Sequence, residues 1–193
     1  KANEVTPVEI DIPWGSTCTV TEDAAAAGNP QFEATTVTIG RAPEVVTVEA
    51  TNTYPYASLS LAKDVTGSAV DQDGNPLTYG PFTFTVDCTY LGEPVYADGY
   101  SADDPMVAEL SSGDDPIVFS ELPAGAECTA TETNDWDASS TTWQAITGAG
   151  TDDEQSDDGD GTTVELVLTP DGEDPVVTNT VTFTNIFDTG SLV

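Results

Sequence analysis

The stretch "SLSLAKDV" (58–65) sets the expected fold. Its leucines and its valine fall on one face of an extended strand, and the small and polar residues between them fall on the other. Lys63 lies on the leucine face, although the chain has only one other lysine, Lys1. A lysine on an inner face is costly to bury unless it is paired. We therefore expect partners for Lys63 elsewhere in the chain.

The composition restricts the class of protein. The chain has 193 residues, 3 Lys+Arg, 35 Asp+Glu and no histidine, for a formal net charge of -32. Nucleic acid and anionic membrane surfaces are excluded as electrostatic partners because no basic patch can form. Without histidine the chain lacks the commonest general base and transition-metal ligand. No apolar run is long enough for a membrane span or a signal peptide.

Abundant Thr and Val favour strands, and abundant Gly, Pro and Asp favour the turns between them. We therefore expect an all-β protein with almost no helix.

The chain also repeats itself. The segment "PWGSTCTVTED" (13–23) resembles "PAGAECTATET" (123–133), and "VVTVEATNTYPYASLSL" (45–61) resembles "TVTFTNIFDTGSLV" (180–193). These matches predict β-domains in tandem.

The repeats predict three parts. Residues 1–56 correspond to the C-terminal half of a preceding repeat, 57–188 to a complete β-sandwich repeat, and 189–193 to the first strand of a following repeat. Half a sandwich exposes strand edges. We expect 1–56 to be completed by upstream residues or by a strand from another copy. Neighbouring repeats of the same chain or fibre are the other expected partners.

Residue parity places one polar side chain inward on each of three strands. Lys63 is joined by Glu132, which shares a face with Cys128, and by Asn185, which shares a face with Phe183.

Residues 1–56 repeat part of this pattern, with Glu22, Asn52 and Cys18 as an equivalent half-site.

These three groups have a chemistry in common. A desolvated lysine becomes a neutral amine nucleophile, and a desolvated glutamate stays protonated and can polarise a carbonyl. The carboxamide of Asn185 offers that carbonyl and can release ammonia. Held together away from water, the three can form a Lys–Asn isopeptide bond without an external catalyst.

Simpler readings of the same residues remain open. Lys63 can be an edge residue that blocks aggregation, or can sit at a fraying strand end. Glu132 faces water if its strand slips by one residue.

The order of these motifs resembles the Cna-B-type domains of Gram-positive surface adhesins and pilins. The phrases "GPFTFTVDC", "LPAGAECTATET" and "VTFTNIFDTGSL" are also similar to a tandem repeat of actinobacterial surface proteins without an assigned biochemical activity. The resemblance implies an immunoglobulin-like sandwich with Lys63 as nucleophile, Asn185 as acceptor and Glu132 as catalyst. A cysteine pair departs from the typical adhesin domain.

The cysteines add a second candidate cross-link. Cys88 and Cys128 fall on inward faces within one domain, and the export-type composition favours a disulfide over two buried thiols. Cys18 is expected to be a free thiol or an intermolecular bridge.

Two further groups are weaker candidates. The run "DDEQSDDGDG" (152–161) is interpreted as a solvated, mobile loop. The alternative is a weak calcium site in this run, with carboxylate ligands from Asp152, Asp153, Asp157, Asp158 and Asp160. Trp136 and Trp143, within the long 134–162 region, could bind glycan or a partner protein.

Together these features predict a structural stalk or fibre segment of an extracellular, cell-surface or cell-wall protein. It is expected not to be an enzyme beyond single-turnover self-cross-linking, and to need no cofactor unless calcium binds. The alternative is a ligand-binding adhesin module, calcium-stabilised or not.

Overall fold

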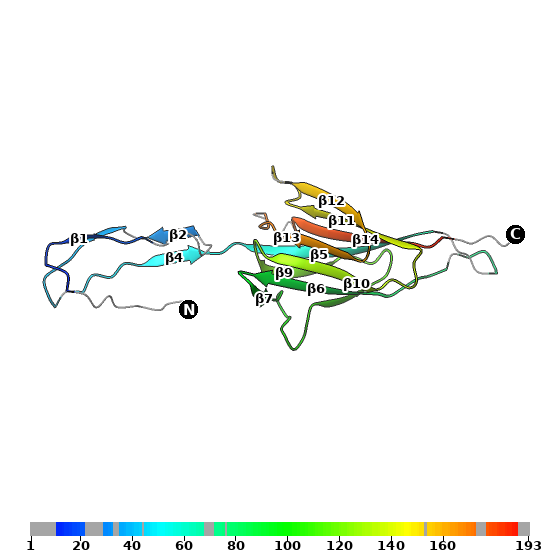
Figure 1. The fold of residues 1–193 in the computed structure, drawn as a ribbon, viewed down its shortest axis with the longest axis horizontal. Helices are drawn as coiled ribbons and strands as arrows, with labels where there is room; N and C mark the ends of the chain where they lie inside the picture. The colour runs from blue at the N-terminus through cyan, green and yellow to red at the C-terminus, as the bar shows by residue number, and fades with distance from the viewer. Residues whose placement is uncertain are drawn as a thin grey trace. The chain divides into compact units, whose positions relative to one another are not determined.

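The computed structural model describes residues 11–21, 29–32, 35–43, 45–67, 72–75, 77–152, 154–172 and 177–188. Every regular element in these ranges is a β-strand, which confirms the all-β prediction (Figure 1). The chain divides into two compact units, Lys1–Tyr54 and Pro55–Val193.

The first unit holds two small antiparallel sheets. One pairs β1 (Thr17–Thr19) with β3 (Thr36–Thr38), and the other pairs β2 (Asn29–Phe32) with β4 (Ala50–Thr53). Large apolar side chains such as Trp14 and Val45 are exposed, and the Arg41 guanidinium lies 5.0 Å from the Trp14 ring centroid. Its described side chains therefore enclose little core.

The second unit is a sandwich of two five-stranded sheets. The sheet that we call the β6 sheet contains β13 (Thr163–Val167), β10 (Glu127–Asn134), β6 (Phe82–Tyr90), β7 (Glu93–Val95) and β8 (Val107–Leu110). The sheet that we call the β5 sheet has the order β12 (Gln155–Asp160), β11 (Ser140–Thr147), β14 (Asn179–Ile186), β5 (Tyr56–Thr66) and β9 (Ile117–Pro123).

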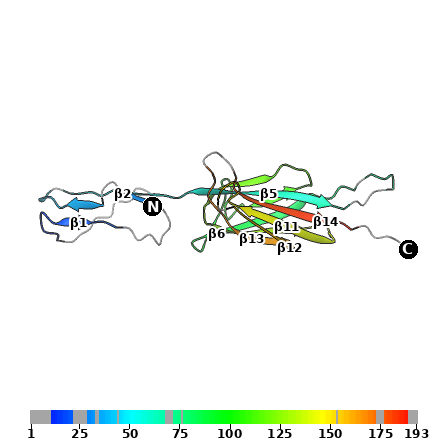
Figure 2. The same ribbon diagram turned by 90° about the horizontal axis from the view of Figure 1, so that it is seen from above.

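The first and last strands of this unit lie side by side and run parallel (Figure 2). Their ladder extends from the pair Asn179 and Leu59 to the pair Ile186 and Thr66. The other ladders described in this unit are antiparallel. The inner-face residues of β5 and β14 therefore share one surface.

Strict alternation of side chains builds the core between the sheets. Along β6 the residues from Phe82 to Cys88 are buried at every second position, and β14 does the same from Val181 to Asn185. The Phe84 and Phe183 rings meet across the sandwich with centroids 5.4 Å apart. The period of two is the pattern that a half-buried strand requires.

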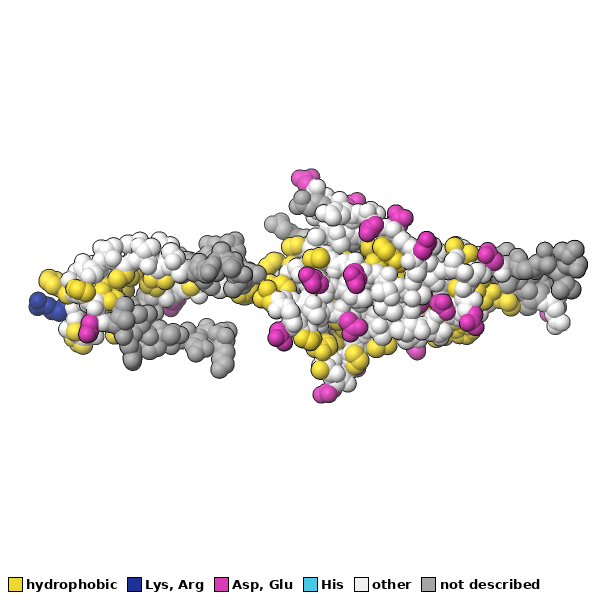
Figure 3. Space-filling model, viewed as in Figure 1, with side chains coloured by type: hydrophobic (Ala, Val, Ile, Leu, Met, Phe, Trp, Pro, Cys, Tyr) yellow, Lys and Arg dark blue, Asp and Glu magenta, His cyan; other side chains and the backbone are white. Residues whose placement is uncertain are grey.

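Acidic side chains are spread over the face of the second unit shown in Figure 3, and no Lys or Arg side chain is visible there. The predicted mobile loop at 152–161 is wrong in part, because Gln155–Asp160 forms the edge strand β12, paired with β11. Carboxylates on an edge strand discourage pairing with other chains. None of the described segments forms a helix able to cross a membrane.

Candidate functional site: a buried Lys–Glu–Asn cluster

Three buried polar side chains from three strands meet inside the sandwich. Lys63 comes from β5 and Asn185 from the neighbouring β14, where Lys63 is paired in register with Phe183, two residues before Asn185. Glu132 reaches the same point from β10 of the opposite sheet. Glu132 Oε1 lies 3.5 Å from Lys63 Nζ and accepts a 2.9 Å hydrogen bond from Asn185 Nδ2.

The cluster is sealed from solvent. The side chains of Lys63 and Glu132 are both 0% exposed, and Asn185 is also 0% exposed. The Phe82 ring covers the amine, with its centroid 4.5 Å from Lys63 Nζ. A site enclosed in this way strengthens electrostatic interactions and penalises isolated charge.

Three oxygen atoms surround the Lys63 amine. Lys63 Nζ donates to the carbonyl oxygens of Asp64 at 2.9 Å and Phe183 at 3.3 Å. The third oxygen is Glu132 Oε1 at 3.5 Å, so the amine is held between two backbone carbonyls and the carboxyl group.

The Asn185 amide and the Glu132 carboxyl group each keep one oxygen atom without a hydrogen-bond partner among the described residues. Asn185 Nδ2 also donates to the Asp135 carbonyl oxygen at 3.3 Å. Glu132 Oε2 and Asn185 Oδ1 are buried and have no hydrogen-bond partner among the described residues. Because buried polar atoms are nearly always paired, two such atoms at one point mark an unusual site.

Burial moves both titrating groups toward their neutral forms. Burial lowers the pKa of Lys63 from 10.5 to about 8, although the negative charge of Glu132 opposes the shift. Burial also raises the pKa of Glu132 above its ordinary value, against the opposing charge of Lys63 and the hydrogen bond from Asn185. The pair is close enough to form an ion pair, yet desolvation is the largest influence on each group, so the pKa of each moves toward the neutral form.

The structure gives no support to the two simpler readings of these residues. Lys63 is not at an edge, because β5 lies between β14 and β9, and Glu132 is not turned toward water. Sequence reasoning missed Phe82 and the Asp135 carbonyl. Phe82 carried a signal, because it shares the inner face of its strand; Asp135 acts through its backbone, which no side-chain pattern reveals.

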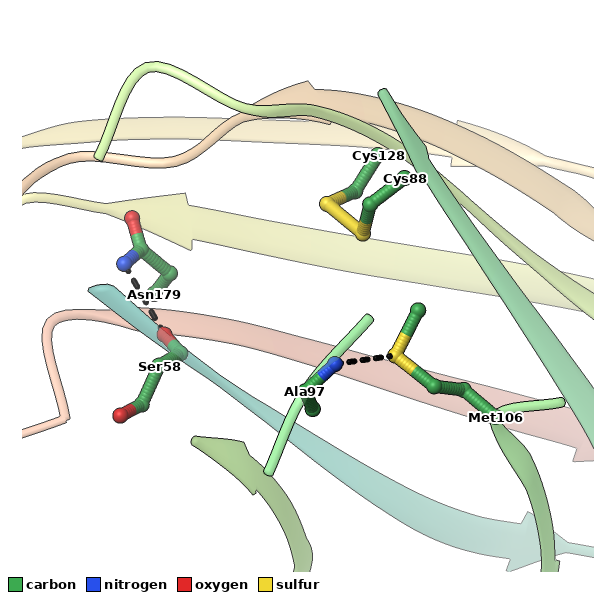
Figure 4. Close-up of a disulfide and its surroundings, with 6 residues drawn as sticks. All are labelled: Ser58, Cys88, Ala97, Met106, Cys128 and Asn179. Atoms are coloured by element: carbon green, nitrogen blue, oxygen red, sulfur yellow. Dashed lines mark hydrogen bonds between the residues drawn. A yellow bond between two sulfur atoms is a disulfide. The ribbon is translucent and has the colours of Figure 1, made fainter. Parts of the chain in front are cut away.

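The predicted disulfide is present in the same unit. Cys88 and Cys128 are directly opposite in the ladder between β6 and β10, with an S–S distance of 2.05 Å (Figure 4). Both residues are buried, at 4% and 2% exposure. The bond therefore joins two strands of one sheet and closes a loop with a sequence separation of 40.

The equivalent half-site in the first unit stays a prediction. Cys18 is a half-buried free thiol in β1, and Asn52 is exposed in β4. Glu22 and the predicted repeat start at 189–193 lie outside the described residues.

The calcium candidates are not gathered into a site where they are described. Asp157, Asp158 and Asp160 lie on β12, and Asp152 precedes it, whereas Asp153 is outside the described residues. No group of three or more His, Cys, Asp or Glu side chains in the described ranges is placed to hold a metal ion.

The tryptophans differ from each other. Trp143 lies in β11, partly buried against the core and close to Gly159 of β12. Trp136 is 45% exposed, and its Nε1 donates a 2.9 Å hydrogen bond to the Pro81 carbonyl oxygen. They therefore do not form a common exposed aromatic surface.

The fold and the cluster define a β-sandwich domain whose first and last strands are joined through buried polar side chains. The sequence matches the family model described as Domain of unknown function (DUF5979) over residues 1–55 and 59–188. The chain belongs to this family. Among curated proteins nothing matches the chain.

Solved structures of pilins and adhesins are similar to the chain. The major pilin from Streptococcus pyogenes is 18% identical with a TM-score of 0.47, over 94% of this chain and 68% of that one. A bacterial adhesin from Mobiluncus mulieris, described as containing intramolecular disulfide, isopeptide and ester bond cross-links, is 20% identical with a TM-score of 0.40, over 75% and 45%. The pilus-presented adhesin Spy0125 (Cpa) is 16% identical with a TM-score of 0.41, over 80% and 32%. The chain thus spans less than half of either adhesin.

Proposed function

We propose that this chain is a load-bearing segment of a Gram-positive surface protein, and that its second unit is locked by an isopeptide bond between Lys63 and Asn185. The observation that carries the proposal is the buried cluster in which Glu132 Oε1 contacts both the Lys63 amine and the Asn185 amide.

The contacts support a balanced reaction. The lone pair of neutral Lys63 Nζ attacks Asn185 Cγ, the bond from Cγ to Nδ2 breaks, and ammonia leaves. Glu132 Oε1 lies 3.5 Å from the attacking nitrogen and 2.9 Å from the departing one. Glu132, neutral at the start, is therefore placed to give its proton to Nδ2 and then to take one from Nζ, acting as general acid and then as general base. The closeness of the reacting groups and the exclusion of water from the site also lower the barrier to the reaction.

The reactive pair is the neutral pair, toward which burial shifts both groups. A protonated amine has no lone pair for the attack, and an ionised Glu132 has no proton to give to the departing Nδ2. The pKa of Lys63, lowered to about 8, leaves part of the amine neutral near physiological pH.

The position of the bond suits a segment under tension. Lys63 is in the first strand of the second unit and Asn185 is in the last. Force that enters before β5 and leaves after β14 would pass through the bond, and the chain between the two residues would carry little load. The neighbouring repeats on either side are the proposed partners in such a fibre.

The disulfide and the charge support an extracellular setting. Disulfides persist mainly in oxidising compartments, and a net charge of -32 keeps separate copies from associating. The proposed role is structural, with one self-cross-linking turnover and no catalytic cycle.

Single-molecule pulling tests this function. When force is applied through both ends, the wild-type second unit should give no unfolding step. Lys63→Ala should release an added contour length of about 30 nm with the disulfide intact, because each freed residue contributes roughly 3.5 Å. A wild-type unit that unfolds with the same step as Lys63→Ala would overturn the proposal.

A further inference from the structure

The parallel pair of β5 and β14 poses a register problem. The connection from Thr66 to Asn179 spans 113 positions (179 − 66), so no tight turn aligns the two strands. A slip of one residue would turn Lys63 to the outer face, which the apolar pattern opposes. A slip of two residues keeps every side chain on its face but moves Lys63 by roughly 7 Å relative to Asn185. Alternation alone therefore does not select the register that the cross-link needs.

A buried hydrogen-bond group marks the first pair of this ladder. Asn179 is 0% exposed and lies opposite Leu59. Its Nδ2 donates to the Ser58 carbonyl oxygen at 3.0 Å (Figure 4) and to the Thr169 carbonyl oxygen at 2.9 Å. Its Oδ1 accepts from both the amide nitrogen and the hydroxyl of Thr169, each at 2.8 Å. The Asn179 carboxamide therefore both donates and accepts hydrogen bonds. It connects β5 at Ser58 to Thr169 and holds β5 at one position along β14.

A second side chain, that of Asp171, also binds β5 at Ser58. Asp171 Oδ1 accepts from the Ser58 amide at 3.0 Å, and Oδ2 accepts from the Ser58 hydroxyl at 2.7 Å. The Ser58 amide is available because the ladder between β5 and β9 shifts register between Ala57 and Leu59. The Asp171 amide in turn donates to the Tyr56 carbonyl oxygen at 3.0 Å.

We propose that Asn179 and Asp171 are positioning residues that fix the register of β5 against β14 and so deliver Lys63 to Asn185. The proposal rests on the proposed cross-link. A two-residue slip would break the bonds of both side chains to Ser58, whereas it would preserve the apolar face. Neither residue touches the reacting atoms in any contact described here, so both act through strand placement.

The test follows cross-link formation in newly synthesised protein. Cell-free synthesis is quenched in denaturant at intervals, and intact mass measures the fraction that has lost one ammonia. Asn179→Ala should slow formation at least tenfold. Asp171→Ala, which alters a partly exposed residue between strands, should slow it several-fold and guards against simple misfolding of the first variant.

Met106→Ala is the matched control. Met106 is 2% exposed, directly precedes β8 of the β6 sheet, and accepts a hydrogen bond on its sulfur from the Ala97 amide (Figure 4). The rates are compared at equal distance below each variant's melting temperature. Rates for both test variants that equal the Met106→Ala rate would overturn the positioning role and leave the cross-link intact. A wild-type protein that never loses ammonia would overturn the cross-link itself, and the positioning role with it.

Discussion

Replacing Lys63 by methionine removes the amine and keeps an unbranched side chain of similar length in the buried space. The variant cannot form the bond to Asn185, and removing the Lys63 charge leaves burial to raise the pKa of Glu132 further toward its neutral form. Its loss of stability therefore measures the cross-link with little contribution from a cavity.

The expected size follows from loop closure. Lys63 and Asn185 are 122 positions apart (185 − 63), and the disulfide already bypasses 40 of them. The remaining loop of about 82 residues corresponds to a contribution of about 4.5 kcal/mol by the chain-entropy relation used for disulfides. For a unit of about 134 residues, that free energy shifts the melting temperature by on the order of 15 °C.

Thermal unfolding followed by circular dichroism, without reductant, is the assay. Lys63→Met should melt on the order of 15 °C below wild type. Glu132→Gln should lose the same bond and melt at least as low, because it leaves Lys63 buried without its carboxyl partner. If Lys63→Met melts within a few degrees of wild type, the bond either does not form or does not stabilise the unit.

Four further outcomes follow from the structure. Cross-link formation in newly made protein should follow a bell-shaped pH profile, because the rate rises as Lys63 loses its proton through its pKa of about 8 and falls as Glu132 loses the proton that the reaction needs; a flat profile would contradict this. Replacing Cys88 and Cys128 together by alanine should cost about 4 kcal/mol in urea unfolding, and an unchanged midpoint would count against it. Gly159→Ala should cost ~1–3 kcal/mol, because its Cβ would lie 2.5 Å from the Trp143 ring; an unaltered melting curve would refute that packing. Chelator should leave the melting temperature unchanged, since no described acidic cluster is placed to hold a metal ion; a fall would revive calcium binding.

The alternation of side chains made much of the second unit predictable. The inward positions of Lys63, Glu132 and Asn185 followed from parity alone, because a strand turns every second residue to the same face. The inward faces of Cys88 and Cys128 followed from the same rule, and the export-type composition then favoured a disulfide between them. The structure adds that Glu132 belongs to the sheet opposite the other two, which parity within single strands cannot reveal.

Other features depend on contacts between distant segments. The composition of the acidic run predicts a solvated loop, but β12 is held by its ladder to β11 and needs no apolar face at a sheet edge. The group around Asn179 was not anticipated, because its bonds run to backbone atoms of Ser58 and Thr169. Hydrogen bonds between a side chain and a distant backbone atom produce no repeating pattern of residues, so the sequence does not predict them.

Intact mass of the reduced, denatured protein tests the central claim most directly. We predict that wild type is lighter than its sequence by one ammonia, and that Lys63→Ala and Asn185→Ala each have the full mass of their sequences. A wild-type mass equal to the sequence mass would show that the buried amine and carboxamide meet without reacting, and the unit would then be held by its disulfide and its core alone.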